Sequence, residues 1–290
     1  MARTVTQAFD EFLTRLTPLE SEREARTKHR DGVEAALRSS MEVGRFLEIG
    51  SFHHGTGIRR HCDVDLLICI KSAKPGSSDT ALGWVKNALT ASFPNTRVRT
   101  SRPAVTIEFA NGNETWKVIP AFSAGRGEES VRVYEIPGPE TGWMGTAPEA
   151  HAGYLNEINS IGKISGGAKK LARLARAWRY YNEVPISSFY LEMRAAEYIS
   201  GEETHIPVWD ICGLLQKLDQ IGLAAMKDPK TVAGQFDACL IPRDREEAVS
   251  KLRRGANRAR KAIEAYHKEE MDEVFYYLDL LFGGNFPARY

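Results

Sequence analysis

The spacing of apolar residues changes along the chain and predicts three regions. In the first 45 residues the period is helical, because apolar side chains recur at i, i+3, i+4 and i+7. The first such set is Phe9, Phe12, Leu13 and Leu16. From residue 46 to about 122, short apolar runs alternate with turns, which indicates strands. From residue 153 to about 282 every strong pattern is helical again.

The middle region contains the strand candidates. They are FLEIG from residue 46, DVDLLICI from residue 63, AVTIEF from residue 104 and ETWKVIPAF from residue 114. A helical segment over 82–93 separates the second run from the third. Asn111-Gly112 lies between the last two runs and predicts a hairpin, because both residues tolerate positive φ. Residues 123–150 are punctuated by Gly and Pro, and we expect little regular structure there.

These regions predict an α+β fold in two lobes. We expect residues 1–150 to form a lobe with a mixed sheet flanked by helices, including the N-terminal helices. We expect residues 151–290 to form a helical lobe, with the site in the cleft between the two. A length of 290 residues is consistent with two units.

Composition narrows the class of protein. The formal charge is +1, from 39 basic and 38 acidic residues, so the chain is unsuited to coating nucleic acid by bulk charge, and we expect no stable nucleic-acid partner. The four cysteines form no CxxC pair, which excludes a disulfide framework or zinc knuckle. The N-terminal stretch does not resemble a signal peptide, and no apolar run would span a membrane. We therefore expect a cytoplasmic protein with no membrane partner.

Asp63 and Asp65 are the leading candidates for catalysis. Strand side chains alternate faces, so both carboxylates share one face, about 6–7 Å apart at their Cα atoms. Oxygen ligands in this arrangement suit Mg²⁺ or a metal pair in phosphoryl transfer. A solvated strand end would show the same DxD pattern, so the pair is not decisive alone.

The upstream turn strengthens the catalytic interpretation. Gly50-Ser51 ends the preceding apolar run, and 11 residues separate Ser51 from Asp63. A glycine lets a phosphate approach the backbone, and Ser51 and Thr56 offer hydroxyl groups to it. The histidines in this turn, with His61 and Cys62, have no spacing that fits structural zinc.

The segment GSFHHGTGIRRHCDVDLLI resembles the signature of the polymerase β-like nucleotidyltransferases. It is most similar to the cGAS/DncV-like nucleotidyltransferases (CD-NTases) of bacterial CBASS anti-phage signalling, which are related to oligoadenylate synthetases. The likeness continues in order through VIPAF, YEIP, KKLARLARAW, ISSFYLE and LFGGNFP. The resemblance implies a polymerase β-like core with a C-terminal helical lobe.

One position departs from this family. The resemblance implies a third carboxylate three residues before Pro120, but the chain has Lys117 there. A lysine cannot bind Mg²⁺ and repels metal ions. In the predicted hairpin Glu108 is a diagonal neighbour of Lys117, so Glu108 either supplies the missing carboxylate or pairs with the lysine. Alternatively, the substitution leaves a slow or inactive nucleotide-binding protein.

Residues 159–182 contain six basic residues and no acid. Lys169, Arg173 and Arg176 lie within about 60° of one another on the predicted helix, opposite its apolar stripe. A solvated face would explain this pattern, but the resemblance implies a triphosphate site at Arg176 and at Ser188 or Ser187. Tyr180, Tyr181 and Tyr190 are candidates for base stacking, with core packing the commoner role.

The resemblance implies that the protein joins nucleoside triphosphates, ATP among them, into a cyclic di- or trinucleotide second messenger and releases pyrophosphate. It implies Mg²⁺ as the cofactor, with Mn²⁺ as an alternative. It also implies an effector protein that responds to the product, and it allows a regulatory protein partner. Two other interpretations stay open: an impaired nucleotide-binding homologue, and a nucleotidyltransferase that acts on RNA or protein.

Overall fold

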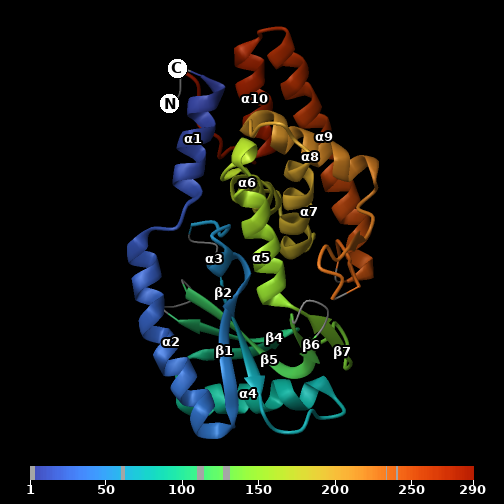
Figure 1. Cartoon of the computed structure of the whole chain (residues 1–290). Coiled ribbons are helices and arrows are strands. Elements are labelled where there is room, and N and C mark those ends of the chain that lie inside the picture. The colour runs from blue at the N-terminus through green and yellow to red at the C-terminus, as the bar shows by residue number, and fades with distance from the viewer. Residues whose placement is uncertain (1–3, 60–62, 110–113, 127–130, 233, 240) are drawn as a thin grey trace.

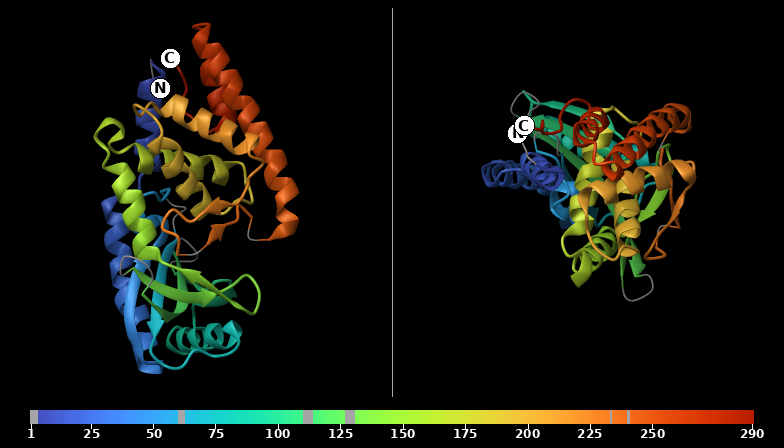
Figure 2. Two further views of the ribbon diagram at one scale, coloured as in Figure 1. Left: turned by 45° about the vertical axis from the view of Figure 1, so that its right-hand side comes forward. Right: turned by 90° about the horizontal axis from the view of Figure 1, so that it is seen from above.

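The computed structural model describes the chain apart from residues 1–3, 60–62, 110–113, 127–130, 233 and 240. A lobe built around a sheet lies at one end of the molecule and a bundle of helices at the other (Figure 1). Both chain termini lie at the helical end (Figures 1 and 2). The predicted fold class, a mixed sheet flanked by helices with a helical C-terminal lobe, is confirmed.

The sheet is mixed, with the order β1-β2-β5-β4-β3. Strands β2 and β5 are parallel, whereas β1 and β4 pair antiparallel with them, and β6 and β7 extend the far part of β5. The strands are β1 (Val43–Ile49), β2 (Val64–Ile70), β3 (Arg97–Ser101), β4 (Ala104–Phe109), β5 (Glu114–Arg126), β6 (Arg132–Pro137) and β7 (Trp143–Thr146).

Helices α2 (Glu20–Ser40) and α4 (Ser78–Ser92) cover one face of the sheet. Alternate residues of β2 belong to that core, namely Val64, Leu66, Ile68 and Ile70. The side chains of Asp63 and Asp65 therefore belong to the opposite face, as the alternation predicts.

The helical lobe consists of α5 (Pro148–Asn159), α6 (Gly167–Tyr181), α7 (Ser188–Ser200), α8 (Pro207–Gln220), α9 (Arg245–His267) and α10 (Met271–Leu281). Short elements complete it: η3 (Gly162–Ile164), η4 (Pro242–Asp244) and the strand pair β8 (Met226–Lys227) and β9 (Gln235–Phe236). Among the residues that the structure describes, no helix is both long and apolar enough to cross a membrane.

Helix α1 (Val5–Leu16) packs in the helical lobe, which differs from the sequence prediction. Its rings at Phe9 and Phe12 form edge contacts with Phe282 and Phe286 near the C-terminus. The helical period identified the buried face of α1 correctly but carried no information about which lobe that face contacts. The C-terminal end also packs on the helical core, where Leu281 and Phe282 are buried.

Two local predictions have different outcomes. The turn at Asn111-Gly112 lies outside the described residues, but the strands beside it pair as expected, with Thr106 opposite Lys117 and Glu108 opposite Thr115. The expectation of little regular structure over 123–150 is wrong, because β6 and β7 lie there. Glycines and prolines at the ends of these short strands obscured their alternation.

Candidate active site

Asp65 and Lys117 face one another across the parallel strands β2 and β5. Asp63 directly precedes β2, and its Oδ2 is 2.5 Å from Nζ of Lys117. Both side chains of this ion pair are more than a third exposed, so the pair lies at the edge of the site and not in a closed core. Lys117, the residue that departs from the family pattern, thus lies directly beside the two candidate catalytic carboxylates.

Gly50 packs against Asp65. Strand β1 ends at Ile49, which pairs with Asp65, and the short helix α3 (Gly50–His54) follows at once. Gly50 has φ +70°, and a Cβ atom there would lie 3.0 Å from Cγ of Asp65 and closer still to Oδ2. The position therefore needs glycine both for its backbone angle and for the close approach of the carboxylate.

The environment opposes ionisation of Asp65 and favours a charged Lys117. Burial raises the pKa of Asp65 to about 6, and Asp63 adds to the rise, while Lys117 and Arg176 oppose it. Burial also acts to lower the pKa of Lys117, but the two aspartates outweigh that effect, and the pKa is raised overall. Lys117 is therefore a positive charge paired with Asp63 and close enough to Asp65 to act on its pKa.

Glu108 does not pair with Lys117, so that expectation was wrong. Its carboxylate lies 3.0 Å from Nε of Arg99 and 3.6 Å from a terminal nitrogen of Arg97, both on the adjacent strand β3. Glu108 would have to leave both arginines before it could bind a metal ion. The predicted register between β4 and β5 is correct, but the partners of Glu108 come from the edge strand β3 on the other side of β4.

Thr56 and Arg173 bind protein groups in this structure. The hydroxyl of Thr56 donates a hydrogen bond to Glu192 of α7. Arg173 on α6 donates to the carbonyl oxygens of Gly55 and Gly57, the latter at 3.2 Å. These contacts attach the turn that follows α3 to the helical lobe, which is a positioning role for both residues.

The backbone of Ser51 closes the same turn. Its carbonyl oxygen accepts hydrogen bonds from the amides of Thr56 and Gly57, each at 2.9 Å, and its side chain is buried. The turn that carries Gly50 and Ser51 is therefore tightly folded before any substrate binds.

A buried pair that sequence reasoning missed joins α3 to α7. Nδ1 of His54 lies 3.0 Å from Oε2 of Glu192, and both side chains are almost completely buried. Nε2 of His54 has no hydrogen-bond partner within the described part of the chain. The turn histidines were considered only as a metal cluster. His61 and Cys62 lie outside the described residues.

The basic helix α6 presents Arg176 to this cluster. Its charge acts to lower the pKa of both Asp65 and Glu192, and its Nε is buried without a hydrogen-bond partner among the described residues. Arg179, one turn on, donates from its Nε to the carbonyl of Ile186, and burial and Arg176 lower its pKa. The i+3 progression 173–176–179 was a signal that could have identified Arg179.

The other residues predicted to contact the nucleotide have different surroundings in the structure. Lys169 is half-buried, and its charge adds to the burial that lowers the pKa of His53. Ser187 caps α7, because its hydroxyl oxygen accepts from the amide of Tyr190 at 3.3 Å, which leaves Ser188 as the serine without a capping role. Tyr190 is fully buried and its hydroxyl donates to Ala224, so it belongs to the core and does not stack on a base.

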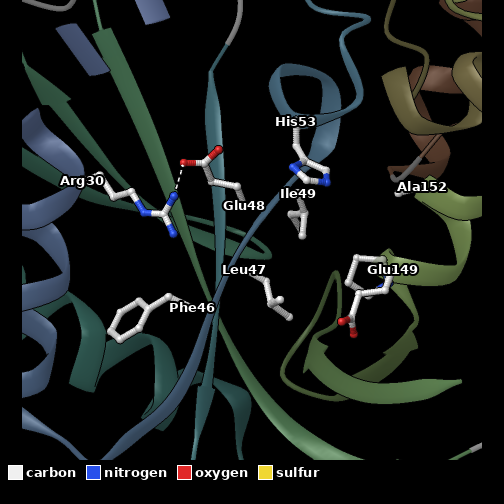
Figure 3. Close-up of a pocket in the computed structure, with 9 residues that line it drawn as sticks. Arg30, Phe46, Leu47, Glu48, Ile49, His53, Glu149 and Ala152 are labelled. Atoms are coloured by element: carbon white, nitrogen blue, oxygen red, sulfur yellow. Dashed lines mark hydrogen bonds and ion pairs between the residues drawn. The ribbon is translucent and has the colours of Figure 1, made fainter. Parts of the chain in front are cut away.

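A cavity of about 400 Å³ lies beside β1 (Figure 3). Its polar lining comes from Arg30, Glu48, His53 and Glu149, and Arg30 forms an ion pair with Glu48 at 2.8 Å. The cavity does not include the aspartates. Ile49 lines the cavity and pairs with Asp65.

The donor set fits one divalent metal ion. Among the described residues, no three His, Cys, Asp or Glu side chains lie close enough together to hold a metal. Mg²⁺, however, commonly binds one or two carboxylates together with substrate phosphates. Asp63 and Asp65 provide such a pair beside the positive charge of Arg176, which suits a triphosphate.

Residues 3–159 match the model of the SMODS family, the Second Messenger Oligonucleotide or Dinucleotide Synthetase domain. The chain belongs to this family. A probable cyclic nucleotide synthase of Bacillus cereus (strain VD146) is 20% identical over 244 residues, which cover 70% of this chain and 73% of the relative.

Solved CD-NTase structures share the whole fold. Escherichia coli MS115-1 CdnC with ATP superposes with a TM-score of 0.74 at 16% identity, covering 98% of this chain and 99% of that chain. A mutant of Vibrio cholerae DncV, in complex with ATP, GTP and 5MTHFGLU2, gives 0.73 at 12% identity, with 98% and 97% covered. Bradyrhizobium diazoefficiens CdnG with GTP gives 0.71 at 14%, with 96% and 95% covered.

The resemblance to the cGAS/DncV-like nucleotidyltransferases is thereby confirmed. This SMODS protein is a nucleotidyltransferase of the class that joins nucleotides into cyclic second messengers.

Proposed function

We propose that this SMODS protein joins two or three nucleoside triphosphates into a cyclic oligonucleotide with release of pyrophosphate, as a signal in anti-phage defence. The observation that carries the proposal is that Arg176, whose buried Nε has no hydrogen-bond partner among the described residues, lies near enough to Asp65 for its charge to act on the pKa of that carboxyl. A carboxylate pair for a metal ion and a cation for a triphosphate then lie in the same part of the molecule.

Each cycle makes one phosphodiester bond. The 3′- or 2′-hydroxyl oxygen of one nucleotide bonds to the α-phosphorus of another, the bond from that phosphorus to pyrophosphate breaks, and the hydroxyl proton passes to water. A divalent ion, Mg²⁺ or Mn²⁺, bound by Asp63, Asp65 and phosphate oxygens would activate the hydroxyl and stabilise the leaving charge. Repetition of the same step within one pocket closes the ring, with two bonds for a dinucleotide and three for a trinucleotide.

The remaining residues position these groups. Gly50 and Ser51 hold the turn against Asp65, and Arg176 with Ser188 binds the triphosphate. Arg173 and Thr56 fix the turn to the helical lobe. Lys169 adds positive charge at the edge of the site, next to His53.

The solved relatives suggest substrates and partners. CdnC is described with ATP, DncV with ATP and GTP, and CdnG with GTP. We include ATP among the substrates of this chain on that basis. CdnC also forms a complex with a HORMA protein, and a regulatory partner of that kind is part of the proposal, as is an effector that binds the product.

A second candidate function is favoured by the ion pair of Lys117 with Asp63. A cation that occupies a metal-binding carboxylate is expected in a homologue that binds nucleotides without joining them. This alternative requires that the protein binds nucleotides but forms no product with either Mg²⁺ or Mn²⁺.

The test is incubation of the full chain with the four α-labelled nucleoside triphosphates and Mg²⁺ or Mn²⁺. A phosphatase-resistant product made without added RNA, and lost in Asp65→Asn, supports a cyclase. Label transferred only to RNA or protein contradicts it. Nucleotide binding without product in either metal supports the second candidate. CdnC forms a complex with a HORMA protein, so this chain is also assayed with added extract from the cells that express its gene. The extract supplies a regulatory partner if the enzyme needs one.

A further inference from the structure

The charge around Asp63 and Asp65 is too small for two metal ions. The two carboxylates supply two negative charges when ionised, and Lys117 cancels one of them from 2.5 Å away. Two-metal sites place two divalent ions about 3.5–4 Å apart, and their mutual repulsion has to be offset by several carboxylates. Asp63, Asp65 and Lys117 together offer metal ions a net charge of about one negative unit, and the nearby cation of Arg176 reduces it further.

The position of Lys117 is fixed by the sheet. Strand β5 is hydrogen-bonded to β2 on one side and to β4 on the other, so its backbone cannot move away without breaking both ladders. Lys117 lies directly opposite Asp65 in the parallel pair, and its ammonium lies against an oxygen of Asp63. A metal ion bound to that oxygen would compete with the ammonium for the same lone pairs.

Other carboxylates do not compensate within the described residues. Glu108, on the next strand, is occupied by Arg97 and Arg99. Glu192 is buried and held by His54 and Thr56. Among the described residues the site therefore combines two carboxylates with the paired cation of Lys117, and the charge of Arg176 also acts on Asp65.

We propose that the Lys117 ammonium takes the place of one of two metal ions, so that the enzyme works with a single divalent ion per site. This inference rests on the proposed function and specifies its metal requirement. Lys117 stabilises negative charge near Asp63 permanently, whereas the exchangeable ion is bound by both aspartates and the phosphates of the substrate. The lysine is thus part of the catalytic site and not a lesion in it.

The experiment counts Mn²⁺ by electron paramagnetic resonance in the full chain, with and without α,β-methylene-ATP. We expect one ion per chain with the nucleotide, with the spectrum of an isolated Mn²⁺. Lys117→Asp is expected to bind two ions with a spin-coupled spectrum, and Lys117→Arg, which keeps the cation, to bind one. Two ions in the wild type, or one ion in Lys117→Asp, would overturn the proposal.

Failure of the proposed function gives a different pattern. If no nucleotide product forms, the count in the wild type still shows whether the lysine replaces a metal. If the analogue does not bind, the proposed function fails, and the titration without nucleotide is used instead, where Lys117→Asp must bind at least one more ion than the wild type. Thermal unfolding of each variant verifies that the counted protein is folded, and the wild-type count does not depend on any variant.

Discussion

The imidazole of His54 and the carboxylate of Glu192 connect the two lobes of the molecule through a buried contact of 3.0 Å. His54 ends the short helix that begins at Gly50, whereas Glu192 belongs to α7 of the helical lobe. Thr56 donates to the other oxygen of the same carboxylate. Glu192 therefore determines where the glycine-serine turn lies relative to the helices that carry Arg176 and Ser188.

Replacement of Glu192 is expected to destabilise the protein in a pH-dependent way. Burial alone would raise the pKa of Glu192, but hydrogen bonds and charge from His54, with Arg176 and Thr56, lower it below its usual 4.5. A lowered folded-state pKa gives stability that is present above pH 4.5 and is lost as the pH falls through the folded value. Glu192→Ala should cost about 3–5 kcal/mol at pH 7, because it leaves the buried partners of Glu192 uncompensated.

Urea unfolding at pH 7 and pH 4 measures this effect. Glu192→Gln keeps the shape of the side chain, and its loss should be smaller than that of alanine and should shrink at pH 4. A double-mutant cycle with His54→Ala isolates the pair, with an expected coupling of about 0.5–3 kcal/mol. If the loss of unfolding free energy in Glu192→Gln grew toward pH 4, the lowered pKa assigned to Glu192 would be wrong.

Gly50→Ala should reduce activity far more than Gly55→Ala. The two glycines have nearly the same backbone angle, φ +70° and +71°, so the strain of adding a Cβ atom is matched. At Gly50 the new atom would meet Asp65, whereas at Gly55 no atom of the described residues lies within 4 Å. We expect about a 100-fold loss of turnover for Gly50→Ala from misplacement of the carboxylate.

Gly55→Ala should lower the free energy of unfolding by about 1–2 kcal/mol and leave turnover within a few-fold of the wild type. The comparison uses initial rates of pyrophosphate release together with melting temperatures. Equal losses of turnover in the two variants would show that the contact between Gly50 and Asp65 has no catalytic importance.

The sequence located the local parts of the site and misjudged their long-range partners. The alternation in β2 and the turn at Gly50 are properties of neighbouring residues, and both were predicted correctly. The Asn111-Gly112 hairpin also gave the correct register between β4 and β5. It led to the two alternatives that Glu108 supplies the missing carboxylate or pairs with Lys117, because a hairpin is the strand pairing that local sequence shows.

The actual partner of Lys117 is determined by a different pairing. The parallel contact of β2 with β5 joins segments about 50 residues apart, and no local pattern encodes its register. The same reason explains why Glu192 was missed, since it lies 138 residues from His54. Helix α1 had a clear apolar face, but an apolar stripe does not specify its partner lobe.

Arg176 and Arg173 lie one turn apart on α6, and their replacement should affect different properties. Arg176→Met should weaken triphosphate binding about 10- to 100-fold, the equivalent of losing a charge-assisted hydrogen bond. Arg173→Met removes bonds to the carbonyls of Gly55 and Gly57 and should lower the free energy of unfolding by roughly 1.5–3 kcal/mol.

Calorimetric titration with ATP and chemical unfolding distinguish the two roles. We expect Arg176→Met to lose less stability than Arg173→Met, because its Nε has no described hydrogen-bond partner to lose and only its charge near Asp65 and Glu192 is removed. If Arg173→Met weakened nucleotide binding as much as Arg176→Met at unchanged stability, the positioning role given to Arg173 would be wrong.

Asp65→Asn should stabilise the metal-free protein above pH 6. Burial raises the pKa of Asp65 from 3.8 to about 6, so the folded state binds a proton that the unfolded state releases between these values. Stability therefore falls as the pH rises from about 4 to 6 and stays reduced above it, where the buried group is ionised. At pH 7.5 in EDTA the asparagine should recover about 1–3 kcal/mol. At pH 3.5 both proteins hold a neutral side chain there, and the difference should vanish.

Asp63→Asn is the matched control, because its carboxylate is more exposed and its ion pair with Lys117 is partly solvated, worth about 0–1 kcal/mol. Thermal unfolding in EDTA at both pH values, followed by a repeat with Mn²⁺ and a triphosphate analogue, completes the measurement. Ligands stabilise the state that binds them. The melting temperature of the wild type should therefore rise when Mn²⁺ and the analogue are added, and that of Asp65→Asn should not. A less stable Asp65→Asn at pH 7.5 in EDTA would show that Lys117 and Arg176 compensate Asp65 fully. The reversed order after addition of metal and nucleotide would identify the buried charge as a cost that substrate binding offsets.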